Sequence, residues 1–422
     1  MKRSRRSGRG GATALPVSSW LHPSVAGVVA AITGFASSFA IVLTGLTAVG
    51  ASATQAASGL LIICLTQGLM SIAVSWRYRM PVVFAWSTPG GALLAGAGTV
   101  THHFAEAVAA FVVASALIVL TGLWPALARL IARIPKTLAN AMLAGILLPI
   151  CLSPVTAAVR EPWLAIPVIV LWLLLLRFAP RWAVPAAIVL TGALLAMTTD
   201  GGWANGVSLV PHFAFVAPQF SFPVLVGIAV PLYIVTMAGQ NIPGVAILHS
   251  FDYDVPVRPS LLGTGAFSAL GAMFGGIPIN LAAITQAMTA GPDAGADRDR
   301  RWIAPIAAGA TYIVLGLAAG VATGFVRAAP PILIEAVAGL ALMGALTGAL
   351  VGAVSVAQQR IPAILTLLLT ASGVAVLGIG SAFWGLLIGA AAFALLSWRP
   401  RDQARGEMTA PTAELPRTSA PL

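Results

Sequence analysis

Apolar residues in this chain fall into runs of about 17 to 25 residues, the length that an α-helix needs to cross roughly 30 Å of hydrocarbon. Only 8% of the 422 residues are charged, whereas 59% are hydrophobic. A soluble domain carries about a quarter charged residues, because its surface is wetted. These runs therefore indicate a polytopic integral membrane protein whose solvent is the lipid bilayer.

The hydropathy pattern predicts fourteen transmembrane segments in an all-α membrane fold. The first seven cover about 24–49, 54–75, 82–98, 103–123, 135–151, 163–178 and 182–198. The second seven cover about 223–248, 259–275, 277–290, 302–325, 331–354, 361–377 and 380–397. A polar stretch, Thr199–Ser221, separates the two sets. Because each half has an odd number of segments, the halves form a 7+7 inverted repeat.

The basic residues support this segment count. With a cytoplasmic N-terminus, 21 of the 23 Lys and Arg fall on the cytoplasmic side, and only Arg160 and Arg327 fall outside. This asymmetry predicts a multi-pass protein with both termini in the cytoplasm. The net charge of +11 lies in connectors and in unstructured tails at 1–22 and 398–422, so we expect no nucleic-acid partner.

Two segments are interrupted at matching places. In the third, Val82–Trp86 has the composition of a strand, Ser87 or Thr88 can cap a helix, and Pro89 suits its first turn. The tenth segment repeats this plan, with Ile277–Ile279 extended and Asn280 as the cap. Each half is thus expected to hold a short strand followed by a half-helix. The alternative is that Pro89 and Pro278 only kink two longer helices.

Paired broken segments indicate a transport site, because two helix N-termini can hold one carboxylate without Lys or Arg. We therefore predict substrate binding by residues at the two breaks and by two amides deep in the eighth segment: Ser87, Thr88, Ile279, Asn280, Gln240 and Asn241. The alternative for Gln240 and Asn241 is interhelical hydrogen bonding.

No other group in the segments predicts further chemistry. Glu106 and Glu335 lie near segment ends and identify no proton carrier, and Cys64 and Cys151 predict no disulfide. We expect no metal, no cofactor and no enzymatic activity, because the segments lack clustered acids or histidines and the chain has no phosphate-binding loop.

At these residues the chain resembles the BenE family of benzoate/proton symporters. The resemblance covers nearly all of 20–397 and is most specific at four places: Val82–Leu94, Ala238–Gly244, Asn280–Thr285, and Gly291-Pro-Asp with Arg301–Ala304. More distantly, the chain is similar to nucleobase/ascorbate and sulfate-type anion transporters. The likeness implies a core domain of 23–123 and 223–325 that moves like an elevator against a gate domain of 124–198 and 326–397. Residues 199–222 would form an extracytoplasmic connector between the halves, and the likeness implies a protein of the bacterial inner membrane.

The resemblance also bears on the substrate. Nucleobase carriers of this fold have glutamates at the places that Gln240 and Ile277 occupy here. Their absence favours an anionic substrate, and benzoate taken up with protons is the leading hypothesis, with Phe39, Phe84 and Trp86 as an apolar wall for its ring. Another organic anion, a nucleobase, a facilitator without proton coupling, a channel and a membrane-embedded enzyme are the alternatives. A homodimer is a candidate assembly.

Overall fold

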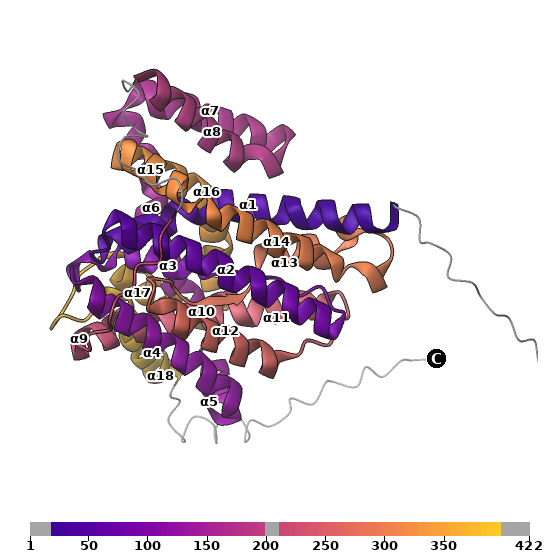
Figure 1. Cartoon of the computed structure of the whole chain (residues 1–422). Helices are drawn as coiled ribbons and strands as arrows, with labels where there is room; N and C mark the ends of the chain where they lie inside the picture. Colours follow the sequence, from indigo (N-terminus) through magenta and orange to yellow (C-terminus); the bar gives the residue numbers. More distant parts are fainter. Residues whose placement is uncertain (1–17, 199–210, 398–422) are drawn as a thin grey trace, which may run out of the picture.

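The computed structural model describes residues 18–198 and 211–397. The predicted tails lie outside these residues, except for the last few residues before segment 1, and so does the first half of the predicted connector, 199–210. The described chain is a bundle of helices with one two-stranded sheet inside it (Figure 1).

Helices α1 to α8 come from the first half of the chain. They are α1 (Ser18–Ala48), α2 (Ala53–Tyr78), α3 (Thr88–Ala95), α4 (Phe104–Leu123), α5 (Pro125–Ala132), α6 (Lys136–Arg160), α7 (Pro162–Phe178) and α8 (Ala183–Thr198). Strand β1 (Phe84–Trp86) precedes α3, and the short 3-10 turns η1 (Ala97–Thr99) and η2 (Pro180–Trp182) follow α3 and α7.

The second half begins with one long helical stretch that contains two π-helical turns. It consists of α9 (Phe222–Val224), η4 (Leu225–Ala229), α10 (Val230–Thr236), η5 (Met237–Asn241) and α11 (Ile242–Ser250). It is followed by α12 (Val257–Ala272), strand β2 (Ile279–Leu281), α13 (Ile284–Ala290), α14 (Ile303–Leu317), α15 (Ala319–Ala328), α16 (Pro331–Ala353), α17 (Arg360–Ala371) and α18 (Ser381–Ser397). The turns η6 (Pro292–Ala294), η7 (Arg298–Arg300) and η8 (Ala357–Gln359) connect these elements.

Every predicted segment coincides with a helix, a helical stretch or a strand-and-helix pair. In the described part of the chain, however, six helices are long and apolar enough to cross a membrane alone, or seven if the bent α14–α15 pair is one span. That pair turns by 55°. The multi-pass helical fold is thus established, while the count of fourteen spans and the 7+7 repeat stay predictions.

Several helix boundaries differ from the sequence-based prediction, and one short helix was not predicted. Helix α6 continues to Arg160 through two internal prolines, because neighbouring helices shield the freed backbone groups. Helix α17 ends at Ala371, before the predicted boundary at 377. Helix α5 was not predicted as a separate element, since eight residues are too short for a span signal.

Glycines bring several helices into close contact. A Cβ on Gly339 of α16 would lie 2.3 Å from the Ile150 carbonyl oxygen of α6, and one on Gly45 of α1 would lie 2.4 Å from the Gly91 oxygen of α3. Such approach is the usual way that membrane helices gain packing energy. The contact at Gly45 also fixes the position of the half-helix α3, which carries part of the predicted site.

Candidate functional site

The two broken segments meet inside the protein as an antiparallel strand pair. Phe84 pairs with Leu281, Ala85 with Asn280, and Trp86 with Ile279. The prediction of a short strand followed by a short helix is therefore confirmed in both segments. A strand at membrane depth needs partners on both edges, because lipid offers none.

On the outer edge of each strand, a backbone N–H donates a hydrogen bond to a serine of the preceding helix. Ser71 of α2 accepts a hydrogen bond from Phe84 N at 2.9 Å, and Ser268 of α12 accepts one from Ile279 N at 2.9 Å. In both halves, a serine on the helix that precedes the strand accepts a hydrogen bond from a backbone N–H of that strand. This correspondence is what an internal repeat would produce.

Ser87 is the N-cap of α3, as the sequence indicated. Its hydroxyl oxygen accepts a hydrogen bond from Gly90 N at 3.2 Å and another from Thr236 Oγ1 at 2.8 Å. The side chain is fully buried. Ser87 therefore ties the start of α3 to α10, and its hydroxyl oxygen already accepts two hydrogen bonds.

Asn280 does not cap α13, contrary to the prediction. It lies within β2, and the N-cap of α13 is Ala283, which makes no side-chain hydrogen bond. In the amide orientation that satisfies both of its groups, Asn280 accepts from Ser87 N at 3.0 Å and donates to the Leu281 carbonyl at 2.9 Å. The strand pairing continues one residue beyond Asn280, so the helix can begin only after it.

Two more buried amides hold the strands in place. Asn241 Oδ1 accepts from Leu281 N at 2.9 Å, and Gln286 Oε1 accepts from Val83 N at 3.1 Å. The Gln286 amide nitrogen also donates to the Pro81 carbonyl. For Asn241, these contacts match the alternative of interhelical hydrogen bonding.

Gln240 and Thr88 differ from these buried residues. Both are half-buried, and neither side chain has a hydrogen-bond partner among residues 18–198 and 211–397. Gln240 lies in the π-helical turn η5, a distortion that is common at functional sites. Its neighbour Gly239 adjoins α3 and α6: a Cβ there would be 3.9 Å from Pro89 Cγ and 3.8 Å from Leu143 Cδ2. Gln240, an amide with free donors and an acceptor, is thus the residue next to the backbone that adjoins the start of α3.

The predicted aromatic residues belong to a buried cluster. Trp86 Nε1 donates to Ser38 Oγ at 2.9 Å, and the indole packs edge-on against Phe35 and Tyr312. Phe39 stacks on Phe35 with 5.2 Å between ring centroids and also contacts Phe325. Trp86 and Phe39 are only 3% and 5% exposed. Both side chains therefore lie in the protein interior next to β1.

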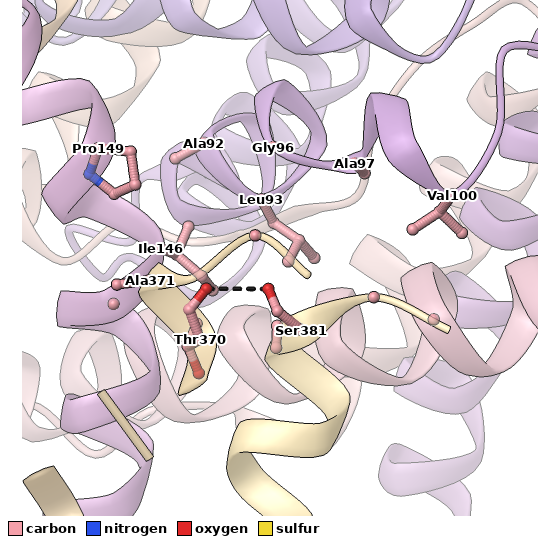
Figure 2. Close-up of a pocket in the computed structure, with 15 residues that line it drawn as sticks. Ala92, Leu93, Gly96, Ala97, Val100, Ile146, Pro149, Thr370, Ala371 and Ser381 are labelled. Carbon is pink, nitrogen blue, oxygen red and sulfur yellow. Dashed lines mark hydrogen bonds between the residues drawn. The ribbon is translucent and has the colours of Figure 1, made fainter. Parts of the chain in front are cut away.

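Figure 2 shows a cavity of about 60 Å³ at the opposite end of α3. It is bordered by Ala92, Gly96, Ile146, Thr370 and Ser381, and Ser381 Oγ donates to the Thr370 carbonyl at 2.9 Å (Figure 2). Pockets that hold drug-sized ligands are about 300–1,000 Å³. No predicted site residue borders this cavity, which is too small for an aromatic acid.

The motif that includes Arg301 and Trp302 after α13 has a structural role that sequence reasoning did not assign. Arg301 donates to the Ala290 carbonyl at 2.8 Å and to the Gly295 carbonyl at 2.9 Å. It thereby closes the C-terminal end of α13, where carbonyls lack helical partners and a cation is favourable. The adjacent Trp302 ring lies 4.1 Å from the Arg79 guanidinium carbon.

Two carboxylates lie near helix ends, away from the strand pair. Glu106 Oε2 accepts from Thr101 Oγ1 at 2.6 Å at the start of α4. Glu335 of α16 lies 3.5 Å from Ser153 Oγ of α6. Neither contacts the residues around β1 and β2 through a hydrogen bond in the described chain.

Comparisons with known proteins identify the family. The family model for the benzoate membrane transport protein, BenE, matches residues 20–395. Inner membrane protein YdcO of Escherichia coli (strain K12) is 37% identical over 374 residues, which are 88% of this chain and 95% of that protein. The benzoate membrane transport protein of Acinetobacter baylyi (strain ATCC 33305 / BD413 / ADP1) is 34% identical over 381 residues, 89% of this chain and 95% of that protein.

Solved structures show the same fold at low sequence identity. The transmembrane domain of the cyanobacterial bicarbonate transporter BicA superposes with a TM-score of 0.56 at 14% identity, covering 89% of this chain and 98% of that one. SLC26A9 superposes with a TM-score of 0.59 at 13% identity, covering 90% of this chain and 67% of that one. The chain is therefore a membrane transporter rather than an enzyme, and it belongs to the BenE family of benzoate membrane transport proteins.

Proposed function

We propose that this protein takes up benzoate or a similar aromatic carboxylate across the bacterial inner membrane, together with protons. The observation that carries the proposal is the unpartnered, half-buried amide of Gln240, which follows Gly239, the residue that adjoins the start of α3. The name of the Acinetobacter baylyi relative supports benzoate as the substrate.

The electrostatics of α3 favour an anion. A helix N-terminus carries about half a positive charge. Pro89 has no N–H, and Gly90 and Gly91 donate to Ser87. The Thr88 N–H and the Gln240 amide are therefore the groups left to donate to a carboxylate, which suits charge-assisted hydrogen bonds in a medium of low dielectric constant.

The proposed binding site would lie where the predicted core domain meets the predicted gate domain. Gly239 faces both Pro89 of α3 and Leu143 of α6, which belong to the predicted core and gate domains. Movement of one domain against the other would then expose the same site to each side of the membrane in turn. This elevator-like movement, the two domains and the cytoplasmic position of both termini are parts of the proposal.

Replacing Gln240 and its neighbour should separate binding from folding. Gln240→Ala should raise the KM for benzoate by roughly five- to thirtyfold, because one hydrogen bond to a charged group contributes about 1–2 kcal/mol. Its thermal unfolding in detergent should stay unchanged. Asn241→Ala should instead lower the unfolding temperature, because Leu281 N loses its acceptor. Equal KM values for Gln240→Ala and the unmodified protein would remove Gln240 from the site.

Proton coupling has its own test. An inward proton gradient should drive accumulation of radiolabelled benzoate in proteoliposomes, and a protonophore should abolish that accumulation. Uptake that only equilibrates, whatever the gradient, would identify a facilitator. Competition by unlabelled uracil in the same assay would favour a nucleobase over a carboxylate.

A further inference from the structure

Helix α5 joins α4, in the predicted core, to α6, in the predicted gate, and it has an unusual surface. It follows α4 after a single residue, Trp124, and begins at Pro125. In Figure 1 it lies at the edge of the molecule, at the end of α4. Trp124 and Leu130 are each 57% exposed. Large apolar side chains can be this exposed in a membrane protein because they contact lipid.

Two arginines share this surface with the apolar side chains. Arg129 and Arg133 are four residues apart, which places them one turn apart on the same side of a helix. Together with Trp124, Leu127 and Leu130 they border an open surface hollow of about 350 Å³. Both arginines are exposed, and neither side chain makes an ion pair or hydrogen bond with a residue in 18–198 or 211–397.

The neighbouring sequence supplies no counter-ion for these charges. No Asp or Glu occurs between Glu106 and Glu161, whereas Lys136 adds a third basic residue directly after α5. A partner for this surface must therefore supply negative charge to the arginines and apolar groups to Trp124 and Leu130. An anionic phospholipid has both, since its phosphate and its acyl chains lie at adjoining depths of the bilayer.

We propose that α5 and its arginines form a binding site for an anionic phospholipid. Helix α5 also packs against η5, the π-helical turn that contains Gln240. The bound lipid therefore contacts the element that links the predicted core to the predicted gate and adjoins the candidate substrate site. The site holds a phosphate headgroup at Arg129 and Arg133, with the acyl chains along Trp124 and Leu130.

Quenching of Trp124 fluorescence tests lipid binding directly. Brominated phosphatidylglycerol or brominated phosphatidylcholine is titrated into the purified full chain. The same titration of Trp124→Phe gives the fluorescence of the other tryptophans, and the difference between the two proteins is the Trp124 signal. Each basic residue near an anionic surface contributes about fivefold in affinity. Phosphatidylglycerol should therefore quench at about thirtyfold lower mole fraction than phosphatidylcholine, and Arg129→Gln/Arg133→Gln should abolish the difference.

A charge-matched variant controls for general electrostatics. Arg77→Gln/Arg177→Gln removes two exposed arginines elsewhere on the predicted cytoplasmic side and should retain the preference for phosphatidylglycerol. Equal quenching by the two lipids in the unmodified protein would overturn the proposal, as would equal loss of preference in both double variants. Displacement of the lipid by inorganic phosphate at matched ionic strength would mean that the site takes a soluble anion instead.

Discussion

Thr88→Asp should weaken benzoate binding by about a hundredfold or more without unfolding the protein. Two like charges about 5 Å apart at an effective dielectric constant of about 20 repel by about 3 kcal/mol, which is more than a hundredfold in affinity. The new carboxylate would also offset the partial positive charge at the start of α3. Thr88 is half-buried and its side chain has no partner in the described chain, so the fold can accept the change.

Thr88→Asn is the matched control, because it has nearly the shape of Asp and no charge. It should transport benzoate with a KM close to that of the unmodified protein. Transport assays in proteoliposomes measure both variants, and unfolding in detergent checks their integrity. An unchanged KM in a well-folded Thr88→Asp protein would show that the anion does not bind at the start of α3. Asn280→Asp is less informative, because it also removes the hydrogen bond to the Leu281 carbonyl.

Gly339→Ala should destabilise the protein by about 3 kcal/mol. The new methyl group would lie 2.3 Å from the Ile150 carbonyl oxygen, and a backbone atom cannot rotate away as a flexible side chain can. Helices α6 and α16 would have to separate, which costs the packing along their whole contact. Thermal unfolding in detergent measures the loss.

Gly344 on the same helix provides the control. A Cβ there would meet no atom within 4 Å, so Gly344→Ala should be neutral or stabilise the protein by up to about 1 kcal/mol through its better helix propensity. If the two alanine variants unfold at the same temperature, the close approach of α6 and α16 does not contribute to stability.

The sequence predicted the features that depend on short stretches of chain. Val82–Trp86 is β-branched and aromatic, and Ser87 precedes Pro89, so the strand, the cap and the half-helix of the third segment follow from local preferences. The apolar runs located nearly every helix for the same reason. The family resemblance and the family model agree over almost the same residues.

Features that depend on contacts distant in sequence were not predictable in this way. Asn280 has the composition of a cap, but pairing with Ala85 keeps its backbone extended. Asn241 and Gln240 are adjacent and chemically alike, yet only Asn241 reaches Leu281 N. No sequence pattern distinguishes the two amides. The π-helical turn that contains both residues has no composition signal either.

The strand pair has a consequence for how the protein is made. Phe84 and its partner Leu281 are 281 − 84 = 197 residues apart. At roughly 5–20 residues per second, synthesis takes about 10 to 40 s to bring β2 out of the ribosome after β1. During that interval the inner edge of β1 must be held by something other than β2. The first half of the transporter therefore cannot finish folding until β2, in the second half, has been synthesised and inserted.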